Sequence, residues 1–469
     1  MKIVKKIFLP LAIIMFLFII YFLYQKIIFN NKAGNLNLIL ISVDTLRPDH
    51  MGVYGYNKNT TPNIDKWAKD AFVFTNAYTI IPLTYPSFTA LMTGRYPIET
   101  KIIDNADGPM QNNIKTLAEN LKKKGYATGA SVTNMALDSE LTNINRGFDY
   151  YEVNEDEKEV MGSLDYLDNG FNWIRDNKQV PFFFWLHIKA PHRPYYPRTQ
   201  LRNIFSKSYK NTIEGINFSE ARSRQDELVK KIKCYKQDGI KDEKYLEELI
   251  DTYTRLYDED ILNGDYIFKH IIDYINKSGL NKNSIIVFYG DHGESMDHDY
   301  YFSHGRVIYN SSVKIPLMIK LPNNENGVID YLIDNTSIHN IISNLLFNTN
   351  RAHLSLKDID SLVKRYSKDE IYIMDNAATK GGIVNKRYKY IKTLRTFKDD
   401  CLNKYSEEFY DLSLDKAENT NLISQIKYKE IIDKLREDFK TNFFKYFPMK
   451  EKDINNSQDK IDKLKSLGY

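Results

Sequence analysis

The chain has 469 residues, of which 42% are hydrophobic and 27% charged, a composition typical of a globular protein with room for two or three domains. Its formal net charge is only +4, and no basic stripe is interleaved with aromatic residues, so we expect no nucleic-acid partner. The two cysteines, Cys234 and Cys401, are too few for a disulfide framework and lack the spacing of a metal site, although one bridge between them stays possible.

The first 35 residues predict a membrane anchor. Residues 7–24 form an apolar run that is just long enough to cross a bilayer, and no small-x-small cleavage site follows it. Three lysines before the run favour a cytoplasmic N-terminus, whereas two lysines after it oppose that orientation. We expect an uncleaved anchor over residues 1–35, with the rest of the chain extracytoplasmic. A buried core helix is the alternative.

Residues 36–330 predict an α/β catalytic domain. Five short apolar runs have the pattern of buried strands, and helical patterns near residues 63–72, 84–94 and 113–124 lie between them. This alternation indicates a mixed, mostly parallel sheet with helices on both faces. The five runs are "LNLILISVD" (36–44), "YATGASV" (126–132), "PFFFWLHIK" (181–189), "SIIVFYGDHGE" (284–294) and "KIPLMIKLP" (314–322).

Three further segments have a different pattern. Residues 198–250 are charged and helical without a strand signal, which predicts a helical insertion on the catalytic domain. Residues 331–425 combine a helix near 337–347 with short strands in "EIYIMD" and "IVNKRYKYIKTL", which predicts a smaller C-terminal α+β subdomain. Residues 426–469 are charged and amphipathic, and we expect a helical tail there.

The stretch "TYPSFTALMTGRYP" (84–97) has the signals of a helix with a hydroxyl at its start. Pro86 suits a first helical turn and Gly94 suits a helix end, which places Thr84 just outside the N-terminus. A helix N-terminus favours anions because its N–H groups are unpaired. Thr84 is therefore a candidate nucleophile for an anionic substrate.

Polar residues follow the predicted strands, where α/β folds place ligands. Two acids, an imidazole adjacent to one of them and a nearby hydroxyl form a donor set for one divalent metal. Each residue alone has a structural alternative, since an acid after a strand can cap a turn and "DHG" can be turn chemistry. The candidates are Asp44, Thr84, His187, His192, Asp291, His292 and, downstream in "FSHG", His304.

Several long segments resemble the sulfatase family of the alkaline phosphatase superfamily, among them "LILISVDTLRPDHMGVYGY", "TYPSFTALMTGRYP", "LHIKAPHRPYYP", "IIVFYGDHGES" and "EFYDLSLDKAENTNLI". The resemblance covers nearly the whole chain after residue 36 and implies that family's α/β fold with a smaller C-terminal domain. It also implies roles for single residues. Those roles are metal ligands (Asp44, Asp291, His292 and Thr84), the nucleophile (Thr84), groups that hold the substrate or protonate the leaving group (His192 and His304), and pocket residues (His187, Asn105 and Arg47, the last with a structural alternative).

One position departs from the family pattern. Sulfatases that hydrolyse sulfate esters convert Cys or Ser within C/S-x-P-S-R to formylglycine, whereas this chain reads "TYPSF". Threonine cannot form that aldehyde, and Phe88 replaces the arginine. A formylglycine hydrate expels sulfate by collapsing to the aldehyde, but a sulfated threonine cannot release its sulfate in this way. A phosphorylated hydroxyl can be relieved by water or an alcohol, so Thr84 favours phosphoester chemistry.

We therefore expect a metal-dependent hydrolase or transferase that acts on an anionic ester, with phosphomonoesters or phosphodiesters favoured. A sulfatase that works without formylglycine and an inactive sulfatase-like binding protein are the alternatives. Superfamily transferases with a threonine at this position usually have several membrane spans, whereas one is expected here. A histidine ligand favours Zn or Mn over Ca or Mg, which prefer oxygen ligands. The oligomeric state is left open.

Overall fold

The computed structural model describes residues 36–154, 164–205, 213–232, 243–347, 354–396, 402 and 405–447. Among the helices of these described residues, not one combines the length and the hydropathy that a bilayer crossing requires. The anchor expected over residues 1–35 lies outside the described residues, as does the end of the expected tail beyond residue 447.

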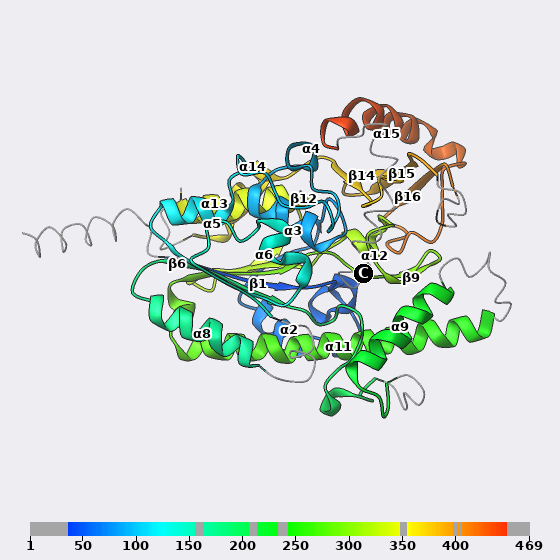
Figure 1. The fold of residues 1–469 in the computed structure, drawn as a ribbon. Coiled ribbons are helices and arrows are strands. Elements are labelled where there is room, and N and C mark those ends of the chain that lie inside the picture. Colours follow the sequence, from blue (N-terminus) through cyan, green and yellow to red (C-terminus); the bar gives the residue numbers. More distant parts are fainter. Residues whose placement is uncertain are drawn as a thin grey trace, which may run out of the picture.

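An eight-stranded sheet forms the centre of the molecule (Figure 1). Its middle strand β1 (Asn37–Val43) runs parallel to both neighbours, β6 (Phe182–Ile188) and β7 (Ser284–Gly290), and all three strands are buried throughout. The strands from β7 through β1, β6 and β4 to β5 are parallel, and β10 joins antiparallel to β7. The prediction of a mixed, mostly parallel sheet is therefore confirmed. The strand order is β11–β2–β10–β7–β1–β6–β4–β5, and the outer strands are β2 (Phe72–Phe74), β4 (Ala127–Val132), β5 (Tyr150–Val153), β10 (Leu317–Lys320) and β11 (Gly327–Ile329).

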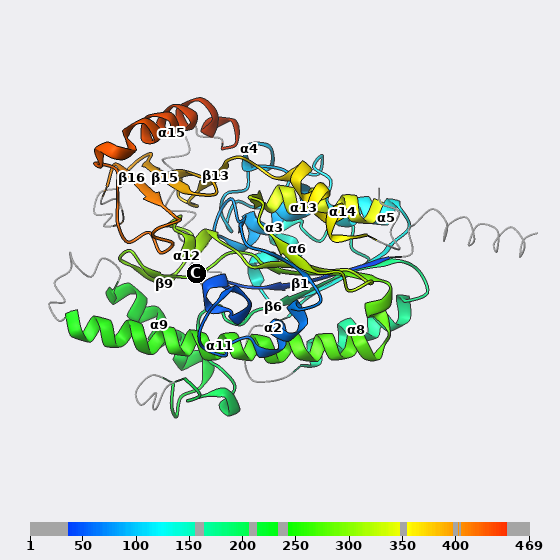
Figure 2. The ribbon, with the colours of Figure 1, turned by 180° about the vertical axis from the view of Figure 1, so that it is seen from behind.

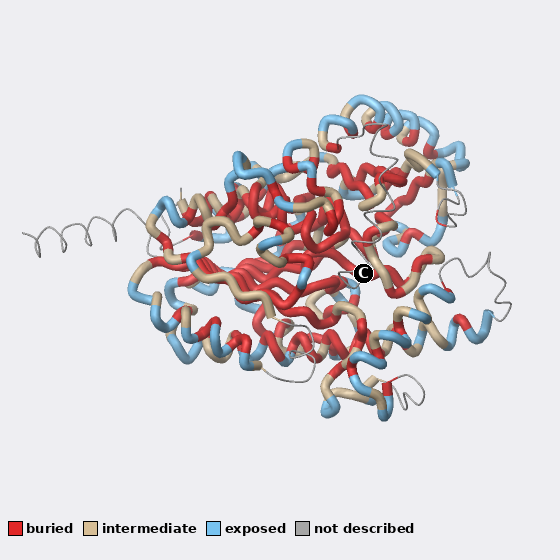
Figure 3. Tube along the Cα trace, viewed as in Figure 1, coloured by how far each residue is buried: buried red, intermediate tan, exposed pale blue. Residues whose placement is uncertain are grey.

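Helices cover both faces of this sheet, as Figures 1 and 2 show from opposite sides. Side chains alternate between faces along β1, so Ile39 and Ile41 pack into one apolar layer and Leu38 and Leu40 into the other. The centre of the sheet between these layers is buried (Figure 3), whereas its edge strands β5 and β11 are partly accessible to solvent. One layer includes α2 (Pro62–Ala68), α8 (Asp165–Asn177) and α11 (Glu243–Lys277), and the other α3 (Thr84–Thr93), α5 (Leu117–Lys123), α13 (Asn335–Phe347) and α14 (Leu356–Tyr366).

A smaller antiparallel sheet lies beside the central one. One face of this sheet is covered by α15 (Lys429–Asn442), whose buried residues Ile432, Leu435 and Phe439 recur at helical spacing. Both elements fall where the sequence predicts the C-terminal subdomain and the start of the tail. The strands are β13 (Ile371–Met374), β14 (Lys380–Val384), β15 (Tyr388–Thr393) and β16 (Glu407–Asp411), in that order.

The remaining elements are short. The hairpin of β8 (Ser295–Asp297) and β9 (Tyr300–Ser303) connects β7 to the segment that carries His304, and β3 (Ala77–Tyr78) pairs with β12 (Ile333–Asp334). The short helices are α4 (Pro97–Thr100), α6 (Ser139–Thr142), α12 (Asn310–Val313), η1 (Pro48–His50), η2 (Gly52–Tyr54), η3 (Met135–Leu137), η4 (Thr199–Leu201), η5 (Leu280–Lys282), η7 (Ile426–Tyr428) and η8 (Phe443–Lys445).

The helices of the predicted insertion differ from the expected boundaries. The first, α9 (Phe218–Ile232), lies within residues 198–250, but α11 starts there and continues to Lys277. Its second half carries the buried residues Ile261, Phe268 and Ile271, which pack into the core under the sheet. The charged first half and the apolar second half belong to one continuous helix, so a charge-based boundary near residue 250 does not mark a structural one.

Candidate active site

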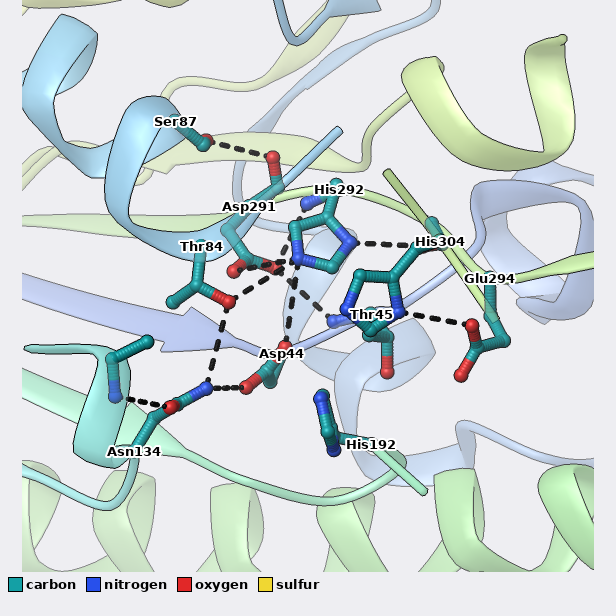
Figure 4. A network of polar contacts seen from close by, with 12 residues as sticks. Asp44, Thr45, Thr84, Ser87, Asn134, His192, Asp291, His292, Glu294 and His304 are labelled. Carbon is teal, nitrogen blue, oxygen red and sulfur yellow. Dashed lines mark hydrogen bonds and ion pairs between the residues drawn. The ribbon is translucent and has the colours of Figure 1, made fainter. Parts of the chain in front are cut away.

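Two parallel strands carry the acidic residues of the candidate site to one edge of the central sheet. Val43 at the end of β1 lies beside Gly290 at the end of β7, so the residues that follow, Asp44 and Asp291, emerge side by side. His292 follows directly, and one ligand atom from each of these three residues lies within 4.8 Å of the others. All three are buried, and Figure 4 shows their side chains close together. The structure therefore brings the sequence-predicted ligands together.

The carboxylates of this cluster have the chemistry of a cation site. Asp44 Oδ1 and Asp291 Oδ2 accept no hydrogen bond from the described residues. Burial, followed by the charge of Asp291, raises the pKa of Asp44 to about 7. Burial also raises the pKa of Asp291 to about 7, although the N–H groups of Thr45 and His292 donate to its Oδ1 at 3.1 and 2.8 Å. Two buried carboxyls with raised pKa values, each with one oxygen that accepts no hydrogen bond from the described residues, fit a divalent cation site.

The ring of His292 is oriented for ligation. Its Nδ1 lies 2.9 Å from the Gly293 carbonyl oxygen, which can only accept, so Nδ1 carries the proton. Burial lowers the pKa of His292 to about 3, which keeps the ring neutral. The Nε2 lone pair therefore faces the cluster, 3.4 Å from Asp291 Oδ2 and 3.8 Å from Asp44 Oδ1. A backbone acceptor behind a ligating imidazole is the usual way to fix its tautomer.

Thr84 joins this cluster from α3. It is the first residue of the helix and Leu83 is the N-cap, so the helix begins one residue earlier than the sequence prediction placed it. The predicted end at Gly94 is confirmed by its left-handed φ of 66°. Thr84 Oγ lies 3.3 Å from His292 Nε2, and because that nitrogen is the ring acceptor, the hydroxyl donates to it. The buried hydroxyl thus faces the carboxylate cluster (Figure 4).

The two predicted substrate histidines lie together but differ in their environment. His304 Nδ1 lies 3.0 Å from Glu294 Oε1, and the ring centroids of His304 and His192 are 5.2 Å apart. Burial would raise the pKa of Glu294, but His304 lowers it below its ordinary value, so the carboxylate stays charged. Burial lowers the pKa of His192 well below its ordinary value, and its Nδ1 donates to the Arg193 carbonyl at 2.6 Å. His304 thus has a carboxylate partner at Nδ1, and His192 is neutral.

Of the two weaker candidates, His187 lies beside the cluster and Asn105 lies beside the first turn of α3. His187 Nε2 lies 3.7 Å from Asp44 Oδ2, and neither ring nitrogen makes a hydrogen bond with the described residues. Burial lowers the pKa of His187 to about 3, so this ring is neutral too. Asn105 Oδ1 accepts the N–H of Tyr85 at 2.9 Å, which holds the loop of Asn105 against the first turn of α3.

Arg47 has partners away from the cluster. Its guanidinium forms an ion pair with Asp49 at 2.8 Å and donates to the main-chain oxygen of Glu294 at 3.1 Å. The Arg47 N–H also donates to the Tyr257 hydroxyl at 3.0 Å. These contacts fit a structural role for Arg47, which is the alternative that the sequence left open beside a role in the pocket.

A family model described as "Sulfatase" matches residues 36–349, about two thirds of the chain. The chain belongs to the sulfatase family. An arylsulfatase of Clostridium perfringens is 25% identical to it over 471 residues, which cover 85% of this chain and 92% of that relative. An ulvan-active sulfatase of Formosa agariphila is 26% identical over 439 residues, covering 85% and 79% of the two chains. The resemblance to sulfatases that the motifs indicated is thereby confirmed.

The fold is also shared with a solved structure. The phosphonate monoester hydrolase of Agrobacterium radiobacter superposes with a TM-score of 0.66 at 16% identity, covering 89% of this chain and 98% of that one. The sulfatase fold, with its central mixed sheet, helices on both faces and smaller C-terminal sheet, therefore extends over the described part of this chain.

Three further residues of this sulfatase-family site are not among the candidates that the sequence indicates. Lys189 Nζ lies 3.7 Å from Asp44 Oδ2, Glu294 supports His304, and the Asn134 side chain lies against Asp44. Their place in the chain is the signal that could have identified them. Asn134 comes shortly after β4, and the motifs "HIK" and "DHGE" at the ends of β6 and β7 contain the other two.

Metal binding at this site should strengthen as the pH rises toward neutrality. The pKa values of Asp44 and Asp291 are about 7 in the fold without a cation and roughly 3.9 in an unfolded chain. Both carboxyls therefore favour the fold below pH 4, and this contribution is lost as the pH rises through 7. A divalent cation replaces the bound protons, with an affinity gain of at most about tenfold per pH unit for each proton displaced.

Thermal unfolding in EDTA and in Mn²⁺ from pH 5 to pH 8 measures this effect. The increase in Tm that the metal causes should grow with pH. An equal increase at pH 5 and pH 8 would contradict the proposed exchange of protons for metal. Asp297→Asn is a matched control outside the cluster and should keep the wild-type dependence of the Tm increase on pH. Among the hydrogen bonds of the described residues, Asp297 Oδ1 accepts only from the hydroxyls of Ser295 and Ser311.

Proposed function

We propose that this sulfatase-family protein is a metal-dependent phosphoesterase whose nucleophile is Thr84. The observation that carries the proposal is a buried threonine hydroxyl 3.3 Å from the Nε2 atom of His292. The resemblance in the motif "TYPSF" aligns this threonine with the residue that sulfatases convert to formylglycine. The hydroxyl lies at the first residue of a ten-residue helix, and the helix dipole favours an anionic substrate at this end. The protein would cleave phosphomonoesters or phosphodiesters.

The surroundings of Thr84 support phosphorus over sulfur. Phe88, which the motif resemblance aligns with an arginine of sulfatases, packs against Trp185, His187 and Tyr289 with ring centroids 4.7, 5.4 and 5.7 Å away. The side chain is part of the core and offers no charge to the site. A sulfated threonine could not be released by collapse to an aldehyde, whereas a phosphothreonine can be hydrolysed by water. The phosphonate monoester hydrolase among the structural neighbours indicates that this fold accommodates phosphorus chemistry.

The cluster of Asp44, Asp291 and His292, with Thr84, would hold the divalent cation. One imidazole among oxygen ligands favours Zn or Mn. When bound, the cation supplies Lewis acidity, which makes a hydroxyl more acidic and neutralises charge on a transferring phosphoryl group. The remaining steps are carried out by the protein's own side chains.

The reaction would proceed in two displacements. The Thr84 hydroxyl loses its proton to solvent as Oγ bonds to phosphorus, and the bond from phosphorus to the leaving oxygen breaks. The protonated ring of His304 gives its Nε2 proton to that oxygen, so an alcohol departs. A water then attacks the phosphorylated threonine, the neutral His304 takes a proton from it, and the bond from phosphorus to Thr84 Oγ breaks as Oγ regains a proton from solvent. The product is phosphate from a monoester substrate and a phosphomonoester from a diester substrate.

His304, rather than His192, fits the role of general acid. The Glu294 carboxylate accepts from His304 Nδ1 and fixes the orientation of that ring, whereas burial keeps His192 neutral. His304→Ala should lower cleavage of alkyl phosphate esters by about 10²–10⁴-fold. It should affect p-nitrophenyl esters much less, because p-nitrophenolate leaves without a proton.

A kcat/KM series over leaving groups of rising pKa measures this difference. In a plot of log kcat/KM against the pKa of the leaving group, the downward slope should be steeper for His304→Ala than for the wild type. His298→Ala is the matched control, since His298 lies on the same hairpin with its ring directed to the Ala417 carbonyl at 3.1 Å. If His304→Ala lowers kcat/KM equally for alkyl and p-nitrophenyl esters, His304 is not the general acid.

The substrate class is tested with p-nitrophenyl phosphate, bis-p-nitrophenyl phosphate and p-nitrophenyl sulfate, each with Zn²⁺, Mn²⁺, Mg²⁺ and Ca²⁺. We expect turnover of the phosphate esters and none of the sulfate ester. Cleavage of the sulfate ester alone would establish the alternative that the named relatives favour, a sulfatase that works without formylglycine. Faster product formation on addition of an acceptor alcohol would make the protein a transferase.

A further inference from the structure

Asn134 lies between Asp44 and Thr84 (Figure 4). It follows strand β4, precedes the short helix η3 and is 1% exposed. Its Nδ2 donates to Asp44 Oδ2 at 2.6 Å and reaches Thr84 Oγ at 3.5 Å. One amide group therefore contacts both a proposed metal ligand and the proposed nucleophile, and long catalytic contacts of this kind tighten when substrate is bound.

The orientation of this amide is determined by its other end. Asn134 Oδ1 accepts the N–H of Ala136 at 2.8 Å and so caps η3. A flipped amide would lose this cap and would place its oxygen against the Asp44 carboxylate. The hydrogen-bond network therefore assigns the NH₂ group to the side of Asp44 and Thr84.

The two contacts have separate consequences. On Asp44, the bond to Nδ2 occupies Oδ2 and leaves Oδ1, which accepts no hydrogen bond from the described residues, for the cation cluster. On Thr84, Nδ2 and His292 Nε2 approach Oγ at 3.5 and 3.3 Å. A hydroxyl oxygen has two lone pairs. With the Thr84 proton directed to His292 Nε2 and one lone pair directed to Asn134 Nδ2, the other lone pair is available to phosphorus.

We propose that Asn134 is a positioning residue, which turns the Asp44 carboxylate toward the cation and aims Thr84 Oγ at the substrate. The part that concerns Thr84 rests on the proposed function, whereas the part that concerns Asp44 requires only a cation site. Groups that hold metal ligands in place typically contribute 10–100-fold to metal affinity or activity.

Two substitutions separate positioning from folding. Asn134→Asp keeps an oxygen to cap η3 but replaces the NH₂ donor with a second acceptor. Asn134→Ser also retains a capping oxygen and removes the donor without adding charge. Asn154→Asp is the matched control, because Asn154 also follows a strand of the same sheet but bonds to the Ser131 hydroxyl at 3.0 Å.

We expect Asn134→Ser to bind Mn²⁺ about 10–100-fold more weakly in calorimetry. With Mn²⁺ at saturation, both variants should phosphorylate Thr84 about 10–100-fold more slowly in single-turnover assays, with KM changed less than about threefold. Asn154→Asp should match the wild type in both assays. Circular dichroism and Tm confirm that each variant is folded.

Unchanged Mn²⁺ affinity in Asn134→Ser would overturn the role toward Asp44. An unchanged phosphorylation rate in Asn134→Ser, with only the Asp variant impaired, would overturn the role toward Thr84, because added charge would then be the cause. A wild-type protein that hydrolyses phosphoesters without modifying Thr84 would instead overturn the proposed function and the Thr84 role with it. The Mn²⁺ measurement distinguishes these failures, since it does not depend on the nucleophile.

Discussion

Thr84→Ala is expected to abolish phosphoester turnover, with a loss of at least about 10³-fold in kcat, because no other described hydroxyl contacts His292 Nε2 in place of Thr84 Oγ. The fold should survive, since the substitution removes one hydroxyl and one methyl group from a helix start, and a cost of about 1 kcal/mol is typical of such a change. The measurement is kcat on bis-p-nitrophenyl phosphate at saturating metal, together with Tm.

Two companion variants make this result specific. Thr84→Ser retains a hydroxyl and should keep measurable turnover. Thr93→Ala removes a buried threonine from the other end of the same helix, where its hydroxyl donates to the Thr89 carbonyl at 2.6 Å, and should keep wild-type kcat. A Thr84→Ala protein that remains active would show that water, and not threonine, attacks the ester.

Asp291→Asn is expected to lose both metal and activity while the domain stays folded. Asp291 Oδ1 accepts two backbone N–H groups and Oδ2 faces the cluster. An amide oxygen in place of Oδ1 can retain both contacts, but the NH₂ group in place of Oδ2 supplies no charge to the cation. The loss of metal affinity should exceed the 10–100-fold that is typical of a group behind a ligand. Elemental analysis after dialysis and kcat with added Mn²⁺ or Zn²⁺ measure the two effects.

The stability of this variant gives an independent check. Without metal, Asp291→Asn should unfold at the same temperature as the wild type or a higher one near pH 8, because it removes one of two buried carboxyls that repel each other. Asp297→Asn should behave as the wild type in metal content. A full complement of metal in Asp291→Asn would exclude this carboxylate as a ligand.

The strand ends are the most predictable part of the molecule. β1, β6 and β7 are continuous apolar runs, and their buried parallel pairing places whatever follows them at one sheet edge. The sequence pattern alone is therefore enough to predict that Asp44, Asp291 and His292 meet. The spatial pairing of His192 with His304 is not predictable in this way, because it depends on the path of the β8–β9 hairpin.

Other features are not encoded in local patterns. The strands β3 and β12 have two residues each, too few to give a periodic signal. The charged start of α11 resembles a surface insertion, and its continuation under the sheet is determined by tertiary packing. Asn134 looks like an ordinary capping residue, which it also is. Its donor contacts depend on the distance between β4 and the end of β1, which a sequence pattern does not contain.

The central claim, a covalent intermediate on Thr84, is tested most directly by trapping and peptide mapping. Wild-type protein with saturating Mn²⁺ is mixed with a slowly hydrolysed phosphodiester, quenched in acid within the turnover time and digested for mass spectrometry. The account predicts that the peptide that contains Thr84 gains one alkyl- or arylphosphoryl group, which is the diester without its departed alcohol, and that Thr84→Ala gains none. Phosphoester turnover with an unmodified Thr84 peptide at every quench time would contradict it.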